Sequence, residues 1–313
     1  MTKGFKPTNE HNVEQRRWPA IALGVTLVVG AAPAYDFFVK GDGGSSTVSA
    51  YPGAPNLADA PVTIYLQPAK PVDTAPSNRQ QTPVSTTPSK LVCPPPVKQP
   101  IKYAPGQGKT VALTFDDGPG NATMDVLTVL QREGVKATFF VTGENVKKFP
   151  NEISRLAAAG MQVANHSYDH RYPTQVMGGW TPAFLQSQLK QTEDALTGLT
   201  GKPDCFFRPP GGFQTNVISA SNKLGKSVVM WSVDTLDYRQ SSRTTEASTA
   251  AIHAAATKVN GINNPIVLFH TNKASGEPES ELTSNRSNTV AALPGIISWY
   301  REKGFSFVTV MGQ

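Results

Sequence analysis

The stretch VALTFDDGP, residues 111–119, joins an apolar run to two carboxylates and a turn. The run from Val111 to Phe115 has the length and composition of a buried strand. Asp-Gly-Pro is a strong turn signal, so the strand should end at Asp116 and Asp117. We therefore predict a buried strand that carries an acidic pair at its carboxyl end.

Short apolar runs of the same kind alternate with helical patterns from residue 107 to residue 313. Such alternation predicts parallel βα units, hence an α/β fold. A closed or nearly closed (β/α)7-type barrel fits better than a doubly wound sheet, because no G-x-G-x-x-G motif follows the first strand. We expect strands at 111–115, 137–141, 162–165, 205–208, 227–233, 266–269 and 306–310, and helices at 124–132, 152–159, 182–199, 215–224, 245–259 and 288–303.

Polar and charged side chains stand at the carboxyl ends of these expected strands. In a parallel barrel such positions meet at one rim, where active sites lie. Structural polar residues scattered through a fold would not share one strand end. We therefore expect a site built from Asp116, Asp117, His166, Arg208, Asp234, Asp237 and His270.

The segment HSYDH, residues 166–170, supplies two imidazoles four residues apart. Two histidines and one carboxylate leave coordination positions open for water and substrate, which is typical of a catalytic metal site. Zn²⁺ is the usual ion for hydrolysis, whereas Co, Mn, Fe or Ni suits the same ligands. One aspartate of the acidic pair could bind this ion while the other serves as a base.

Three further segments add chemistry to the same rim. Arg208, in FFRPPGG, could pair with the free aspartate, and the glycines beside it let a backbone N–H approach a substrate oxygen. The segment WSVDTLDY, residues 231–238, brings two carboxylates and aromatic walls. His270 follows an apolar strand, and beside a carboxylate it becomes a candidate acid.

The first third of the chain does not have the pattern of a globular domain. Residues 1–17 are predicted to be a basic cytoplasmic n-region, and residues 18–39 a signal peptide or a transmembrane anchor. The uncharged stretch there is 18 residues long and ends in an A-x-A pattern, so cleavage and retention both stay open. Residues 40–106 are predicted to form a Pro/Ser/Thr-rich linker, and residues 107–313 the functional domain. Either outcome places that domain outside the cytoplasm, anchored or secreted.

The net charge of +6 at pH 7 constrains the partners. No Lys/Arg run interleaved with aromatic residues points to nucleic acid, so we exclude that partner. A basic exported protein would instead be attracted to an anionic cell envelope.

Cys93 and Cys205 are the only cysteines in the sequence. Outside the cytoplasm such a pair tends to be oxidised, so we expect a disulfide between the end of the linker and the domain. Two unpaired thiols are the alternative.

Together, TFDDGP, HSYDH, FFRPPGG, WSVDTLDY and VLFH resemble, in order and spacing, the motifs of the NodB-homology polysaccharide deacetylases, carbohydrate esterase family 4. The resemblance covers about residues 108–313 and implies a distorted (β/α) barrel. It implies that Asp117, His166 and His170 bind one divalent metal ion. It also implies that Asp116 is the general base that activates water.

The same resemblance implies roles for the other polar groups. His270 matches the general acid that protonates the departing amine, and Asp237 the carboxylate that keeps it cationic. Arg208 matches the partner that orients the base. The backbone N–H of Gly211 would help to stabilise the oxyanion.

The pocket for the acetyl methyl group shows departures from the family pattern. Leu268 and Tyr238 match positions that line this pocket, although family members commonly have Trp in place of Tyr238. They also commonly have Tyr or Phe in place of Gly211 and often Asp in place of Thr271. None of these departures removes a catalytic group, so we expect activity.

The sequence thus predicts a metal-dependent hydrolase that removes N-acetyl groups from an extracytoplasmic glycan. Export, tethering and basic charge favour N-acetylglucosamine in peptidoglycan, with chitin-like oligomers or O-acetyl groups on xylan as alternatives. A non-catalytic glycan-binding module on the same fold is a second class, and an Fe(II) oxygenase a third. The intact acidic pair and histidines favour the hydrolase.

Overall fold

The computed structural model describes residues 93–120, 122–240, 244–273 and 286–312. All of them belong to the compact unit Ser85–Gln313. The predicted n-region, the signal or anchor segment and most of the predicted linker lie outside the described residues. Among the helices that are described, none combines the length and apolarity needed to cross a membrane.

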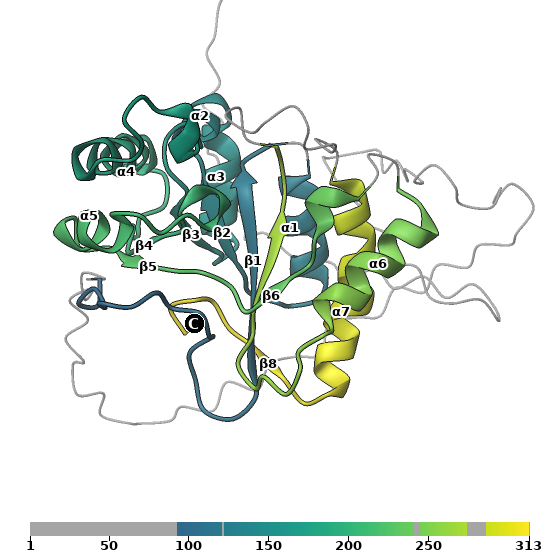
Figure 1. The fold of residues 1–313 in the computed structure, drawn as a ribbon. Coiled ribbons are helices and arrows are strands. Elements are labelled where there is room, and N and C mark those ends of the chain that lie inside the picture. The colour runs from purple at the N-terminus through teal and green to yellow at the C-terminus, as the bar shows by residue number, and fades with distance from the viewer. Residues whose placement is uncertain (1–92, 121, 241–243, 274–285, 313) are drawn as a thin grey trace, which may run out of the picture. The chain divides into compact units, whose positions relative to one another are not determined.

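Within the described residues, eight strands form one sheet, and all the strand pairs are parallel (Figure 1). The order is β5-β4-β3-β2-β1-β7-β6, and β8 pairs with β1 outside this path. A parallel α/β fold is thereby confirmed. The strands are β1 (Thr110–Gly118), β2 (Thr138–Val141), β3 (Gln162–Asn165), β4 (Phe206–Phe207), β5 (Ser227–Val228), β6 (Val233–Asp234), β7 (Ile266–His270) and β8 (Ser306–Phe307).

Helices flank the sheet on both sides of its central strand. In Figure 1, α6 and α7 lie on one side of β1, and α4 and α5 on the other. The α-helices are α1 (Thr123–Arg132), α2 (Gly143–Lys148), α3 (Pro150–Ala158), α4 (Pro182–Leu196), α5 (Val217–Lys223), α6 (Glu246–Ala256) and α7 (Ser287–Glu302), and the 3₁₀ turns are η1 (Pro173–Gln175), η2 (Pro210–Gly212) and η3 (Asp237–Arg239).

Strand β1 is central because its side chains are buried on both faces. Val111, Leu113 and Phe115 join the large core cluster shared with α1, α6 and α7. Ala112 packs in a second cluster with Phe140, from the neighbouring strand β2. Because successive side chains of a strand point to opposite faces, every second side chain of β1 points into the concave face of the curled sheet. The polar residues at the strand ends lie at the rim of this face.

The predicted single strand over residues 227–233 is wrong. The segment forms two strands, β5 and β6, at opposite edges of the sheet. Val229 N–H donates to Phe207 O, whereas Ser232 N–H donates to Ile266 O, so the chain changes pairing partners between them. The sheet is therefore curled, with its two edges linked by this connection, in place of a regular (β/α)7 barrel.

Residues 93–106 pack on the domain, although their proline content assigned them to the linker. Ile101 forms a parallel bridge with Val229, and Tyr103 an antiparallel bridge with Pro265. Proline removes a backbone donor only at its own position, so the residues between prolines keep their N–H groups for single bridges. The packed part of the domain therefore begins before residue 107.

A disulfide joins Cys93 to Cys205, the two cysteines that the sequence expected to pair. Their Cα atoms are 5.2 Å apart, and Cys205, directly before β4, is buried. The bond ties the first described residue to the interior of the sheet.

Candidate active site

Two consecutive aspartates reach the same site because β1 bulges at its end. Side chains on a regular strand alternate between faces, so neighbours such as Asp116 and Asp117 would point apart. The register between β1 and β2 shifts between Asp116 and Gly118, and Asp117 has a left-handed φ of 70°. Both carboxylates then approach His166 Nε2, which lies 3.7 Å from Asp116 Oδ2 and 3.3 Å from Asp117 Oδ1.

Asp117, His166 and His170 form a compact buried cluster. Their potential ligand atoms lie within 4.8 Å of one another, and no other such group was found in the described part of the chain. His170 Nε2 is 3.5 Å from Asp117 Oδ1, and the two imidazole centroids are 4.9 Å apart. These are the three residues that the resemblance implied as metal ligands.

The segment that carries both histidines is a turn, not a helix, so helical spacing does not bring the imidazoles together. Ser167 and His170 have left-handed φ angles of 67° and 56°. Asn165 Oδ1 accepts a hydrogen bond from Ser167 N–H at 3.0 Å, and Ser167 Oγ accepts one from His170 N–H at 3.1 Å. These bonds stabilise the left-handed turn at the carboxyl end of β3.

Gln188, on α4, holds the middle of the same turn. Its Oε1 accepts hydrogen bonds from the N–H groups of Tyr168 at 2.9 Å and Asp169 at 3.1 Å. Its Nε2 donates to Asp169 Oδ2 at 3.1 Å, and the side chain is buried. Helix α4 therefore fixes the turn that presents the two histidines.

The hydrogen bonds and burial of the two histidines suit metal binding. His166 Nδ1 lies 2.7 Å from the backbone oxygen of Arg208, an acceptor, so Nδ1 carries the hydrogen. In the neutral ring, the lone pair of Nε2 then faces the cluster. Burial lowers the pKa of His170 to about 3, against the attraction of Asp117. His170 is therefore neutral at physiological pH, as a metal ligand must be.

The cluster fits a divalent cation. Both carboxylate oxygens of Asp117 and Nδ1 of His170 are buried without a hydrogen bond among the described residues. Buried polar atoms without partners are costly in free energy, and a cation would compensate the carboxylate. Burial alone would raise the pKa of Asp117, but the nearby histidines, His170 foremost, lower it by more than burial raises it. The pKa therefore lies below its ordinary value, and the carboxylate stays ionised. Two imidazoles and one carboxylate are a donor set that Zn²⁺ and related ions accept.

Arg208 holds the other aspartate from the interior of the sheet. Its Nη1 donates to Asp116 Oδ1 at 2.7 Å and to Thr114 Oγ1 at 2.9 Å, while Nη2 donates to Met230 O at 3.1 Å. The guanidinium also lies 4.1 Å from the ring centroid of Phe140. Asp116 is thus fixed in orientation by a fully buried partner, as the sequence proposed.

Asp237 and His270 form a second pair across the rim. His270 Nδ1 is 2.7 Å from Asp237 Oδ1, and Asp237 Oδ2 accepts from His270 N–H at 2.9 Å and from Thr289 Oγ1 at 2.8 Å. Burial would lower the pKa of His270, but the charge and hydrogen bond of Asp237 outweigh it and raise the pKa to about 9. His270 is therefore a cation at neutral pH.

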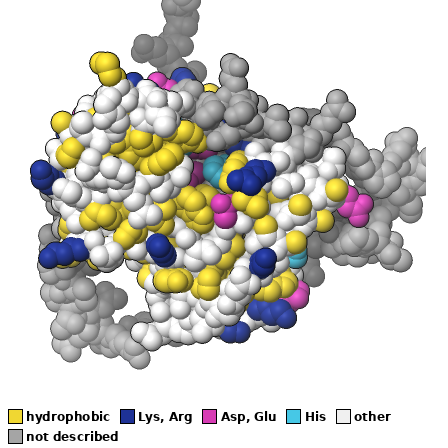
Figure 2. Space-filling view, viewed as in Figure 1, with side chains coloured by type: hydrophobic (Ala, Val, Ile, Leu, Met, Phe, Trp, Pro, Cys, Tyr) yellow, Lys and Arg dark blue, Asp and Glu magenta, His cyan; other side chains and the backbone are white. Residues whose placement is uncertain are grey.

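These groups surround a cavity of about 260 Å³. Figure 2 shows a recess in this face of the molecule, with acidic and histidine side chains inside it and hydrophobic side chains around it. Asp117, Arg208 and Asp237 are fully buried and do not line the cavity. The other predicted residues do line it: Asp116, His166, His170, Gly211, Asp234, Tyr238, Leu268 and His270.

Three residues that line the cavity lie outside the motifs and were missed by the sequence interpretation. Tyr172, Phe213 and Arg239 all contribute to the wall. Each stands within two residues of a motif: Tyr172 after HSYDH, Phe213 after FFRPPGG and Arg239 after WSVDTLDY. Adjacency to a motif was the available signal.

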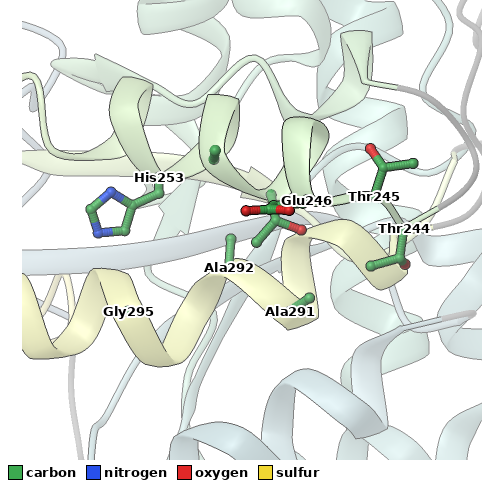
Figure 3. Close-up of a pocket in the computed structure, with 9 residues that line it drawn as sticks. Thr244, Thr245, Glu246, His253, Ala291, Ala292 and Gly295 are labelled. Carbon is green, nitrogen blue, oxygen red and sulfur yellow. The ribbon is translucent and has the colours of Figure 1, made fainter.

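A larger hollow, of about 490 Å³, lies between α6 and α7 (Figure 3). Its described lining is mostly Ala, Thr and Gly, with Glu246 and His253 as the ionisable groups. His253 projects toward α7, where a Cβ at Gly295 would lie 3.3 Å from its ring. No ion pair or metal-ligand group of the described residues is found there, so the smaller cavity is the candidate active site.

Comparison with known proteins supports the resemblance that the sequence motifs indicated. The family model described as "Polysaccharide deacetylase" matches residues 103–229. Two peptidoglycan-N-acetylglucosamine deacetylases of Bacillus cereus are similar: one is 34% identical over 202 residues, which are 64% of this chain and 66% of the relative. The other is 31% identical over 214 residues, 66% of this chain and 71% of the relative. The chain thus spans about two thirds of the length of these relatives.

One further relative and one solved structure extend the similarity. A chitooligosaccharide deacetylase of Rhizobium leguminosarum bv. trifolii is 32% identical over 210 residues, 66% of this chain and 93% of the relative. The crystal structure of the Bc1960 peptidoglycan N-acetylglucosamine deacetylase, in complex with an N-hydroxybenzamide, superposes with a TM-score of 0.56 at 32% identity. That match covers 67% of this chain and 89% of the other.

Proposed function

Because the chain belongs to the polysaccharide deacetylase family, we propose that it is a metal-dependent hydrolase that removes N-acetyl groups from an extracytoplasmic glycan. The glycan that we favour is peptidoglycan, at its N-acetylglucosamine units. One observation carries the proposal: a metal-ligand cluster, an Arg–Asp pair and an Asp–His pair converge on a single cavity.

Asp117, His166 and His170 would hold the divalent ion, and we favour Zn²⁺ over Co, Mn, Fe and Ni. When bound, such an ion supplies Lewis-acid polarisation of a carbonyl oxygen and makes a water molecule more acidic. The chain's own side chains then have to move two protons and stabilise one negative charge.

Asp116 acts as the general base. Arg208 occupies Oδ1, so Oδ2 is the oxygen that accepts a proton from the water attacking the acetyl carbonyl carbon. The fixed orientation of the carboxylate keeps this oxygen at the cavity throughout the reaction. A positioned base of this kind contributes about 10²–10⁴-fold to rate.

His270 acts as the general acid. Its Nδ1 is engaged by Asp237, so Nε2 is the nitrogen that delivers a proton to the amine as the C–N bond breaks. The raised pKa of about 9 keeps this proton on the ring at neutral pH. Acetate and a free amino sugar are the products.

Three residues accommodate the acetyl group itself. The backbone N–H of Gly211 helps to stabilise the oxyanion that develops on the carbonyl oxygen. Leu268 and Tyr238 form the pocket for the methyl group, with the Tyr238 ring 5.2 Å from that of His270.

The choice of glycan rests on weaker grounds than the choice of reaction. The Bacillus cereus relatives are named for peptidoglycan, and a net charge of +6 would draw the protein to an anionic envelope. We propose that residues 18–39 export the domain and either are cleaved or hold it at the membrane by one helix. The chitooligosaccharide deacetylase among the relatives makes chitin-like oligomers the second candidate.

The test is acetate release from peptidoglycan, chito-oligosaccharides and acetylxylan, compared at equal concentrations of acetyl groups. We expect the largest kcat/KM on peptidoglycan. A larger value on acetylxylan would replace the amide substrate with an ester. If no acetate appeared from any of the three at saturating Zn²⁺, the proposal would be wrong and a glycan-binding module would be favoured.

A further inference from the structure

Two aromatic rings, those of Tyr172 and Phe213, form one wall of the active-site cavity. Their centroids are 5.5 Å apart and their planes are tilted by 54°. The Phe213 side chain is 40% exposed, which places it among the few large hydrophobic side chains of the described residues that face solvent. We call these two rings the aromatic platform.

A buried tryptophan beneath the exposed surface supports the aromatic platform. Trp180 is buried and meets the Phe213 ring edge-on, with centroids 5.9 Å apart. Trp180 Nε1 donates to Arg171 O at 3.1 Å, and Asn216 Nδ2 donates to Trp180 O at 2.8 Å. The exposed rings are therefore preorganised, which reduces the entropic cost of binding a ligand on them.

The platform begins directly beside the reacting group. Gly211, whose N–H we assign to the oxyanion, has a left-handed φ of 60°. A Cβ at this position would lie 3.0 Å from Phe213 Cε2 and 3.1 Å from Tyr172 Cε1. Both rings thus pack closely against the backbone of Gly211, and a side chain at this left-handed position would require them to shift. A ligand on the platform would lie next to the sugar whose acetyl group occupies the cavity.

The size of the cavity favours an extended ligand. At about 260 Å³ it is at or below the small end of ligand sites, which span about 300–1,000 Å³. Such a space suits one sugar unit with its acetyl group, so the rest of a glycan chain has to lie across the rim. An aromatic surface is suited to the apolar C–H face of a sugar ring, while the ring's hydroxyl groups remain in water.

We propose that Tyr172 and Phe213 form a subsite that stacks against a sugar adjacent to the one being deacetylated. The protein then selects glycan chains over single N-acetylated sugars. This inference rests on the proposed function, because it assumes that a glycan occupies the cavity.

The experiment compares Phe213→Ala with Phe149→Ala on single N-acetylglucosamine and on its pentamer. Phe149 is also 40% exposed but is outside the cavity lining, so it is a matched control for loss of an exposed ring. For Phe213→Ala on the pentamer we expect kcat/KM to fall about five- to tenfold, mainly through KM. The single sugar has no neighbour to stack on the platform, so its kcat/KM should not change in Phe213→Ala. Phe213→Trp should retain the wild-type KM on the pentamer, and Phe149→Ala should match wild type.

A second measurement separates binding from folding. The pentamer is titrated into Asp116→Asn protein, with and without Phe213→Ala, and the tryptophan fluorescence is followed. Stacking beside Trp180 should change the fluorescence with a Kd that rises about five- to tenfold when Phe213 is removed.

Two results would overturn the subsite. One is an equal loss of kcat/KM on the single sugar and on the pentamer, and the other is an unchanged KM for the pentamer in Phe213→Ala. In both cases acetate release by the wild type would leave the proposed function standing. If the wild type released no acetate from any oligomer or from peptidoglycan, both inferences would fall together.

Discussion

The residues His170 and His270 share one site but have opposite charge states. Burial dominates at His170 and lowers its pKa to about 3, whereas Asp237 dominates at His270 and raises its pKa to about 9. The difference lies in one hydrogen-bonded carboxylate, because Asp117 does not form an equally close pair with His170. A neutral imidazole and a cationic imidazole are thereby obtained from the same residue type.

The charge of His270 gives the enzyme a basic limit. As pH rises through about 9, His270 loses the proton that the leaving amine requires, so kcat/KM should fall. In Asp237→Asn burial still lowers the pKa of His270, and the carboxylate that outweighed burial is gone, so the pKa should fall, with Asp117 as the remaining carboxylate that raises it. The descending limb of a kcat/KM profile should then move to lower pH, measured between pH 5 and 11 on one soluble oligomer.

The same pH profile tests whether His270 is the group that titrates on the basic limb. A basic limb that stays in place in Asp237→Asn would mean that His270 is not the acid. Thr289→Val removes only one hydrogen bond to the same carboxylate and keeps its charge. It therefore serves as the control, and its limb should shift less than that of Asp237→Asn.

At the scale of elements, helix α4 supports the metal-ligand turn through one side chain. Gln188 bonds to two backbone N–H groups and to Asp169, so Gln188→Ala should loosen the turn that carries His166 and His170. We expect the affinity for Zn²⁺ to fall about 10–100-fold, as for other residues that orient metal ligands. Competition with a chromogenic chelator measures this affinity.

A matched control lies on the same helix. Gln191 is exposed and bonds only within α4 among the contacts described, to Ser187. Gln191→Ala should therefore bind Zn²⁺ like the wild type. Equal affinities for Gln188→Ala and Gln191→Ala would show that the turn does not depend on α4.

Helices and strands whose signals lie within their own residues could be predicted from the sequence. Strand β1 contains the mostly apolar run from Val111 to Phe115. Helix α4 begins where Thr181 accepts a hydrogen bond from Phe184 N–H, with Pro182 at the first helical position. Because parallel strand ends converge, the same reasoning grouped the polar residues at one rim. The cluster and the two pairs described above are where that grouping placed them.

Features of the sheet that depend on which strands pair with one another could not be predicted from the sequence. The run over 227–233 contains no Gly, Pro, Asn or Asp that would mark a turn, and only its separate partners β4 and β7 divide it into β5 and β6. The bulge after Asp116 has no local signal either, since it is a register shift against β2. Helix α2 is too short to show a period. The roles proposed for the site residues rest on the resemblance of the five motifs, in order and spacing, to the deacetylase family, because no single motif assigns them.

At the scale of the whole molecule, the disulfide joins residues 112 positions apart. Closing a loop of that length restricts the unfolded chain, so Cys93→Ser/Cys205→Ser should lower the free energy of unfolding by about 2–5 kcal/mol. Urea denaturation measures the loss. Neither cysteine lines the cavity, so the folded variant should release acetate like the wild type. Equal urea midpoints for variant and wild type would contradict a stabilising role.

The central claim is that Asp117 belongs to the metal cluster while its neighbour Asp116 moves the proton. Asp116→Asn retains the shape of the side chain and leaves all three cluster residues in place. His166→Ala removes one of the three and should lose both metal and turnover.

The decisive measurement is acetate release from an N-acetylated glycan by Asp116→Asn protein whose bound metal has been quantified. We predict wild-type metal content together with a loss of acetate release of at least about 100-fold. Acetate release at the wild-type rate, with the same metal content, would contradict the assignment of Asp116 as the base.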